Sequence, residues 1–209
     1  AYELEMKVQY TGEWANQVAE KNAATALIDS GCVLISQHAD TVGAATACEE
    51  KSINNIGYNV SMLDAAPTQA ITSAGLNWGV YYTYAVREGM AGRKPAVDWC
   101  EGFNKGAVAI TEVNRNAFGS DAAYNEANQK AEAAIAAIKA GTLHVFDTSK
   151  FTVGGEKVTS TKDVAGFYGK EYIKTKDGVS YFAESDDALG SAPGFAFVID
   201  GIIELNQAF

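Results

Sequence analysis

Cysteine and histidine are scarce in this 209-residue chain, which holds three of the first and two of the second. Cys32, Cys48 and Cys100 form no CxxC pair, and no histidine lies at metal-ligand spacing from them. A structural zinc site needs several such ligands at short spacing, and a disulfide framework needs an even number of cysteines. Neither is expected here, and apolar neighbours predict that Cys32 and Cys48 are small buried side chains.

Positive charge and long apolar runs are scarce as well. The 16 Lys and Arg residues stand against 26 Asp and Glu residues, so the net charge is −10 and the pI is about 4.6. Such a surface repels the phosphates of nucleic acids and anionic membranes, so neither is an expected partner. No run approaches the roughly 18 apolar residues that span a bilayer. Residues 1–5 also lack the basic start of a signal peptide.

Strand and helix patterns alternate over the first third of the chain, and 47% hydrophobic residues suffice for the core of one domain or two small ones. Residues 4–10 alternate apolar and polar side chains, which predicts a strand with one covered face. A helix pattern over residues 15–30 ends at Gly31. The apolar run 32–36 is typical of a strand buried on both faces of a parallel sheet. The pattern continues with a helix to residue 51, strands at 53–58 and 70–74, and a helix at 77–89.

This order predicts an α/β fold with a mainly parallel sheet and flanking helices. Right-handed crossovers bring the carboxyl ends of such strands to one edge, where open α/β sheets bind ligands. Farther along, Ser120 is placed to cap a long helix that ends at Gly141, and residues 143–146 predict a short strand. Turn signals between residues 151 and 182 predict hairpins.

Motifs of catalysis and phosphate binding are absent from the sequence. It contains no Walker loop, no GxGxxG after a strand and no GxSxG elbow. His38 with Asp40 is the only candidate acid–base pair, and no nucleophile is placed beside it by pattern. The adjacent acids at 49–50 and 186–187 point apart on a helix or strand, as solvated side chains do. We therefore expect no enzyme, no metal and no cofactor.

Aromatic, amide and imidazole side chains follow the predicted strands at their carboxyl ends. An aromatic face can stack on a flat heterocycle, while Asn, Gln and His offer directional donors and acceptors to its rim. Each residue alone is explained equally well by packing or by loop structure, but their joint occurrence at one sheet edge favours a small-molecule site. The predicted ligand-binding residues are Trp14, Gln37, His38, Asp40, Asn59, Asn77 and Trp78.

The helix pattern that begins at Trp78 carries Tyr81, Tyr82 and Tyr84. We expect these rings to pack against a neighbouring lobe or helix rather than against a cofactor, because aromatic side chains contribute most where they bury area.

An ordered series of segments resembles the basic membrane protein family, the PnrA-like solute-binding lipoproteins of ABC importers. The series covers residues 4 to about 148 in register. Its segments are YTGEW at 10–14, ATALIDSG at 24–31, VLISQHAD at 33–40, IGYN at 56–59, AP at 66–67, TS at 72–73, NWGVYY at 77–82 and, more weakly, GTLHVF at 141–146. The resemblance implies a type I periplasmic-binding-protein fold, in which two α/β lobes close over a purine base or purine nucleoside outside the cytoplasm.

The resemblance assigns stacking on the base to Trp14. Nucleoside binders of the family often carry Asp where this chain has Asn59 and Ser61, and a lysine of some members falls near Leu76 and is absent here. Carboxylates are the usual partners of sugar hydroxyls, so these departures favour a free base or another flat heterocycle over a nucleoside.

The resemblance also implies that the chain begins at the first strand of a second lobe. We expect residues 1–148 to form this α/β ligand-binding lobe and residues 149–209 to form a hairpin-rich C-terminal extension packed on it. The implied partners are a small-molecule ligand, an ABC permease and a missing N-terminal lobe. Contact with the membrane is expected only through a lipid anchor outside this sequence.

The sequence therefore predicts a non-enzymatic, extracytoplasmic substrate-binding component of an ABC importer. Two alternatives stay open. The extracellular ligand-sensing domain of a receptor would share the pocket, and a nucleoside-processing enzyme would depend on His38 with Asp40.

Overall fold

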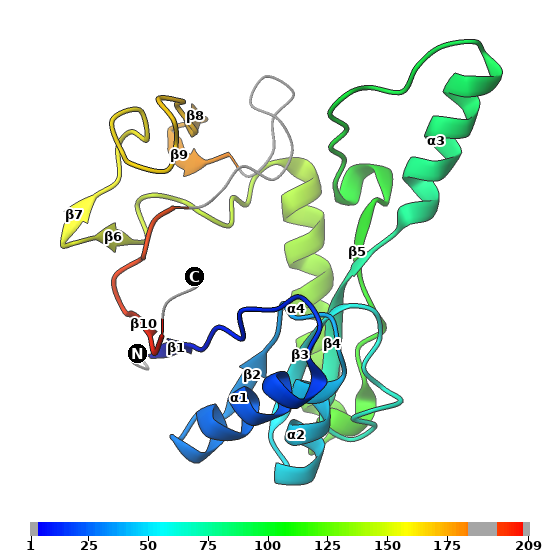
Figure 1. Ribbon diagram of the computed structural model, residues 1–209, viewed down its shortest axis with the longest axis vertical. Helices are drawn as coiled ribbons and strands as arrows, with labels where there is room; N and C mark the ends of the chain where they lie inside the picture. The colour runs from blue at the N-terminus through cyan, green and yellow to red at the C-terminus, as the bar shows by residue number, and fades with distance from the viewer. Residues whose placement is uncertain (1–3, 184–195, 207–209) are drawn as a thin grey trace.

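The largest sheet among the described residues, 4–183 and 196–206, has four strands in the order β2-β3-β4-β5 in the computed structural model (Figure 1). The first three strands are parallel, and β5 runs antiparallel to β4. Their bounds are β2 (Leu34–Ser36), β3 (Asn54–Asn59), β4 (Ala70–Leu76) and β5 (Val108–Ile110). The expected α/β fold with a mainly parallel sheet is confirmed.

Two helices, α1 (Gln17–Asp29) and α2 (Gly43–Lys51), pack against each other and against β2. The buried side chains that the two helices contribute to their shared core are small, and this allows the helix backbones to approach closely. The core contains Ala24, Ile35, Ala44, Ala47 and Cys48, with Cys32 packed against it. Cys48 is fully buried, and burial raises the pKa of its thiol to about 11. The prediction of a buried thiol at Cys48 is therefore confirmed, whereas Cys32 is half-buried.

The first strand departs from the expectation that it joins this sheet. β1 (Met6–Val8) pairs in parallel with β10 (Ile202–Glu204), and β2 is the edge of the four-stranded sheet. The prediction that residues 32–36 are buried on both faces is wrong. Ile35 is buried in the core with α1 and α2, but Val33 and Leu34 are 80% and 49% exposed.

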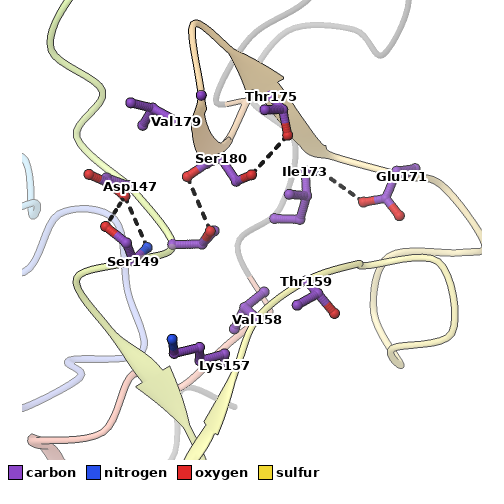
Figure 2. Close-up of a pocket in the computed structure, with 12 residues that line it drawn as sticks. Asp147, Ser149, Lys157, Val158, Thr159, Glu171, Ile173, Thr175, Val179 and Ser180 are labelled. Atoms are coloured by element: carbon purple, nitrogen blue, oxygen red, sulfur yellow. Dashed lines mark hydrogen bonds between the residues drawn. The ribbon is translucent and has the colours of Figure 1, made fainter.

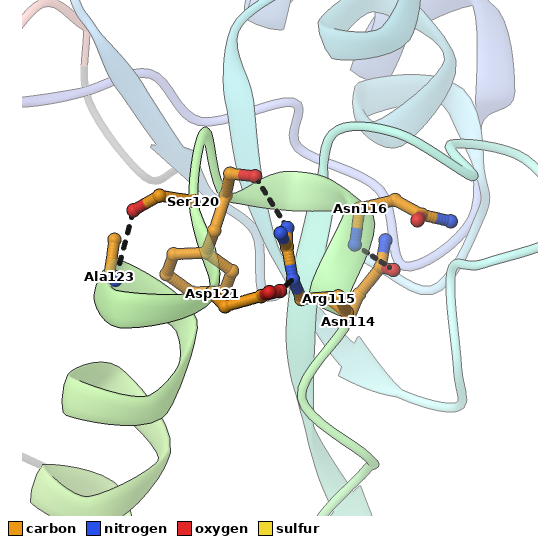
Figure 3. A network of polar contacts seen from close by, with 7 residues as sticks. Asn114, Arg115, Asn116, Ser120, Asp121 and Ala123 are labelled. Carbon is orange, nitrogen blue, oxygen red and sulfur yellow. Dashed lines mark hydrogen bonds and ion pairs between the residues drawn. The ribbon is translucent and has the colours of Figure 1, made fainter.

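The long helix α4 (Asp121–Ala140) begins and ends where the sequence predicts. Ser120 accepts a hydrogen bond from the Ala123 backbone N–H, and Gly141 takes the left-handed conformation that closes the helix. Figure 3 shows how the preceding turn is fixed: the Arg115 guanidinium donates to Asp121 and to the Phe118 carbonyl. Two short 3-10 helices lie before α4, at Phe103–Lys105 and Arg115–Ala117.

The remaining helix, α3 (Trp78–Met90), follows β4 directly and has no buried residue. Figure 1 shows it extending away from the sheet, with the chain returning beside it toward β5. No helix among the described residues is both long and apolar enough to cross a membrane.

Two antiparallel hairpins form the C-terminal part, as predicted, and Figure 1 shows them set apart from the four-stranded sheet. Phe167, Tyr172 and Phe182 form a separate aromatic core beneath them. The prediction of a strand at 143–146 is wrong. This segment contacts β9 through an isolated bridge at Asp147 and a hydrogen bond from the Phe182 N–H to the Phe146 carbonyl, and the His144 ring stacks on Tyr181 with 3.6 Å between ring centroids. The strands are β6 (Thr152–Val153), β7 (Glu156–Lys157), β8 (Ile173–Lys176) and β9 (Val179–Phe182). The acids at 186–187 lie outside the described residues.

Candidate functional site

A hollow of about 690 Å³ lies between residues 6–14, which include β1, and the end of β2 together with the middle of β3. We call it the sheet-edge hollow. Its walls come from residues 6–14, from one face of α1 between Glu20 and Leu27, and from residues 35–39 at the end of β2. Of the predicted ligand-binding residues, Trp14, Gln37 and His38 line it. Three segments that are separate in the sequence therefore converge on one cavity at the predicted edge of the sheet.

The Tyr10 and Trp14 rings and the His38 imidazole line this hollow. The Trp14 side chain is 81% exposed, so its ring is open to a flat partner. The His38 imidazole packs against the Tyr58 ring with centroids 4.3 Å apart, and this contact fixes the orientation of the imidazole at the end of β2. The Tyr10 hydroxyl donates to Glu204 at 2.7 Å. That hydrogen bond, together with partial burial and the carboxylate charge, raises the pKa of Tyr10.

Gln37 holds the loop that follows β2 rather than presenting a free amide. Its Nε2 donates to the carbonyl oxygens of Ala39 and Thr41, at 3.1 and 2.8 Å. Its Oε1 lies 3.5 Å from the Asn55 amide nitrogen. Both ends of the side chain thus have protein partners, so its contribution to a ligand site is to shape the loop that carries His38.

The Asp40 backbone links the loop that carries Trp14 to the loop that carries His38. Its N–H donates to the Trp14 carbonyl at 3.1 Å, which ties the loop after β1 to the loop after β2. The Asp40 side chain is not part of the lining of the sheet-edge hollow.

Glu20 is the functional-site residue that sequence reasoning missed. It is 3% exposed in α1, lines the hollow and accepts hydrogen bonds from both loops. One carboxylate oxygen accepts from the Asn16 N–H, and the other accepts from the Thr41 N–H and, at 2.5 Å, from the Thr41 hydroxyl. The sequence signal that could have indicated this role of Glu20 is the N-cap of α1. Asn16 caps the helix, and an acid four residues later can reach back to the Asn16 N–H, much as in a capping box.

The other predicted residues follow the strands at the same sheet edge but do not line the hollow. Asn59 ends β3 in the left-handed conformation, at φ 67°. Asn77 precedes α3, and its backbone N–H donates to the Ala107 carbonyl. Trp78 begins α3 and stacks loosely on Tyr82, with ring centroids 6.3 Å apart. These three residues would meet a ligand only if it extended beyond the hollow.

A second hollow, of about 480 Å³, lies among the C-terminal hairpins (Figure 2). Two carboxylates border it, and both are already bound by protein donors. Hydrogen bonds from the Ser149 hydroxyl and N–H lower the pKa of Asp147. Burial alone would raise the pKa of Glu171, but hydrogen bonds from Ser160, Ile173 and Thr161 outweigh it and lower the pKa. No group of metal-ligating side chains occurs within residues 4–183 and 196–206.

Comparison with known proteins identifies the class. The family model of PnrA-like ABC transporter substrate-binding proteins matches residues 2–142, so the chain belongs to this family. The family consists of binding proteins, not enzymes, in agreement with the missing catalytic motifs. The matched region includes the sheet-edge hollow and α3, and it ends before the C-terminal hairpins.

Two curated relatives show how far the likeness extends. A purine-binding protein of Brucella abortus is 26% identical over 162 residues, which are 74% of this chain and 44% of that protein. A Haloferax volcanii protein that is named as an ABC transporter glucose-binding protein is 26% identical over 114 residues, 54% of this chain and 29% of its own. The chain therefore spans less than half the length of either relative, and the two differ in the ligand that they are named for.

Solved structures show the fold. An ABC transporter solute-binding protein from Aeropyrum pernix matches with a TM-score of 0.53 at 15% identity, over 69% of this chain and 46% of that one. A transcriptional activator of the comK gene from Bacillus halodurans matches with a TM-score of 0.54 at 18% identity, over 63% and 45%. The α/β architecture is thus that of solute-binding proteins of the periplasmic-binding-protein type.

Proposed function

We propose that this chain is the ligand-binding lobe of an ABC importer's substrate-binding protein and that its ligand is a purine, with a free base favoured over a nucleoside. The observation that carries the proposal is the convergence of Trp14, His38 and the loop held by Gln37 on the sheet-edge hollow. The purine-binding relative supports the ligand class.

The geometry suits a flat heterocycle. The exposed Trp14 ring offers one stacking face, and base–aromatic stacking is worth about 1–3 kcal/mol. The imidazole of His38, oriented by Tyr58, can donate to or accept from the rim of the base. The carboxylate of Glu20 is occupied by Asn16 and Thr41, so it is not available to sugar hydroxyls. Glu13 also lines the hollow and accepts one hydrogen bond from the Asn16 side chain. Our reason for placing a base, and not a nucleoside, in the hollow is that Asn59 and Ser61 stand where nucleoside binders of the family often carry Asp.

The wider function follows from family membership. We propose that the lobe works with a second, N-terminal lobe and delivers its ligand to an ABC permease outside the cytoplasm. In this scheme residues 1–148 form the ligand-binding lobe, and residues 149–209 form an extension. Asn59, Asn77 and Trp78 stay proposed ligand contacts at the rim of the interlobe cleft, and Asp40 supports the Trp14 loop. A lipid anchor outside this sequence would supply the only contact with the membrane.

Calorimetric titration of the full-length protein with adenine, hypoxanthine and guanine tests the proposal. We expect binding of at least one of these bases, and we expect Trp14→Ala to weaken it by at least ~1 kcal/mol, about fivefold, through the loss of stacking. Tyr168→Ala is the matched control, because Tyr168 is an exposed aromatic residue outside the hollow.

Unchanged affinity in Trp14→Ala would remove Trp14 from the site. Saturable binding of D-glucose, without binding of any purine, would overturn the purine assignment and leave the binding role intact. Release of free base from purine nucleosides during incubation would favour the enzymatic alternative.

A further inference from the structure

An uncovered apolar stripe runs along the whole of α3. Trp78, Tyr82, Val86 and Met90 recur at every fourth position of this 13-residue helix. Their side chains are between 54% and 85% exposed. Side chains at i and i+4 lie on one face of a helix, so the four form a continuous ridge. We call this ridge the α3 stripe.

The opposite side of α3 is covered by the loop that follows the helix. Trp99 packs against Tyr81 and Tyr84, with ring centroids 5.2 and 6.0 Å apart. The Tyr84 hydroxyl also accepts a hydrogen bond from the Ala96 N–H at 2.9 Å. The loop thus packs on the side of α3 where those tyrosines point and leaves the α3 stripe open.

The α3 stripe is also uncharged. Arg87 and Glu88 are the only ionisable side chains on α3 apart from its tyrosines, and Glu88 is bound by Arg93 in a two-pronged ion pair. Figure 1 shows α3 projecting away from the four-stranded sheet, and no other helix or strand of the described residues packs along it. A helix with a wide apolar face and no partner buries that face elsewhere.

We infer that the α3 stripe is the docking surface for the part of the family fold that lies outside this chain, and that a helix of that part packs on it. This inference rests on the proposed function, because it gives the N-terminal lobe its contact surface. α3 falls within the residues matched to the family, while more than half of the purine-binding relative and of both structural neighbours lies outside the match. Because the chain matches less than half of each of these proteins, we take the unmatched part of the family fold to be the partner that covers the α3 stripe.

The spacing of the α3 stripe specifies how the partner packs. Rows of residues four apart form ridges that fit into the grooves of a second helix, most commonly at a crossing angle near −50°. A second copy of this chain is the less favoured occupant, since each copy carries a net charge of −10 and self-association would bring these charges together.

Melting of two proteins, both without ligand, tests the inference. One is the 209-residue chain, and the other is the product of the complete reading frame. We expect Tyr82→Asp to leave the melting temperature of the 209-residue chain within ~1 °C, because Tyr82 is already exposed there. In the longer protein the same change should lower it by at least ~3 °C, because the charge would be buried in the contact. Tyr168→Asp, at a still more exposed aromatic residue in the C-terminal part, should have no effect in either protein.

Each other outcome overturns the inference. It fails if Tyr82→Asp leaves the longer protein unchanged, or if the reading frame holds no further segment. It also fails if sedimentation shows the 209-residue chain to be a dimer that Tyr82→Asp dissociates, which would make a second copy the occupant. Because no ligand is added, failure of the purine assignment cannot produce any of these results.

Discussion

At the scale of single residues, Glu20 matters more to the candidate site than its position in a helix indicates. Its carboxylate accepts from Asn16 and Thr41 in the two loops that carry Trp14 and His38. Asp40 adds a third tie between the same loops through its backbone bond to Trp14. A buried acceptor that satisfies three donors is costly to change, because the donors are then left without partners. Glu20 therefore positions the aromatic side chains of the hollow and need not contact the ligand.

Glu20→Gln tests this positioning role. The amide nitrogen would face donors, so we expect a loss of about 1–3 kcal/mol in the free energy of unfolding, measured by urea titration. Hydrogen exchange of the Asn16 and Thr41 amides should accelerate as well. Glu50→Gln is the control, since Glu50 forms an exposed ion pair with Lys21 and should change stability by no more than about 0.5 kcal/mol. Equal effects of the two substitutions would contradict a special role for Glu20.

At the scale of elements, the contact between α1 and α2 depends on one glycine. A Cβ added to Gly43 would lie 2.3 Å from the Gln17 carbonyl oxygen and 3.0 Å from the Lys21 nitrogen. Both are backbone atoms of α1 and cannot move aside without displacing the helix. The absence of a side chain at Gly43 is thus what lets the two helices meet over Ile35.

Gly43→Ala should destabilise the chain by about 1–3 kcal/mol, measured as a shift of the urea midpoint at constant slope. Gly89→Ala in α3 is the matched control, because no atom lies within 4 Å of its added Cβ. There alanine should be neutral or stabilising by up to about 1 kcal/mol, since it is the better helix former. A neutral Gly43→Ala would show that α1 and α2 are not held at this spacing.

At the scale of the whole molecule, the segment at residues 200–206 contacts the first strand of the chain. β10 pairs with β1, and the Asn206 side chain both accepts from and donates to the Tyr10 backbone at 2.8 Å. Just before β10, Asp200 accepts from the Thr152 hydroxyl and from the N–H groups of Gly154 and Gly155. The same short segment therefore binds the β6–β7 hairpin and the first strand.

This contact should be sensitive to acid. The hydrogen bond from the Thr152 hydroxyl, followed by those from the glycine N–H groups, holds the pKa of Asp200 below its usual value. A lowered pKa means that the ionised form stabilises the fold above about pH 4, and that this contribution is lost as the pH falls further. The difference in unfolding free energy between the wild type and Asp200→Asn should thus shrink from pH 6 to pH 3.

Urea titrations at the two pH values measure this difference, with Asp163→Asn as the control at an exposed position. A gap between wild type and Asp200→Asn that is as large at pH 3 as at pH 6 would show that the charge of Asp200 does not stabilise this segment.

The sequence by itself determined the α/β class and most of the helices and strands, although not the absence of a strand at 143–146. The helical repeat, Ser120 and Gly141 give both ends of α4, and the alternating helices and strands give the α/β class, because these signals act within a few residues. Of the seven residues that the sequence placed after the strands, Trp14, Gln37 and His38 line one hollow, and Asp40, Asn59, Asn77 and Trp78 do not.

Only the tertiary structure decided which partner each element has. The alternating pattern of residues 4–10 predicts a strand but does not indicate which strand it pairs with. The structure pairs it with β10, nearly 200 residues away, and leaves β2 as an exposed edge. Gln37 and Glu20 are polar residues whose roles depend on loops that the fold brings together. The α3 stripe has an ordinary helical pattern in the sequence, and only its exposure distinguishes an unpartnered surface from a core. Local patterns fix periodicity and caps, whereas pairing, burial and hydrogen-bond partners depend on contacts between distant segments.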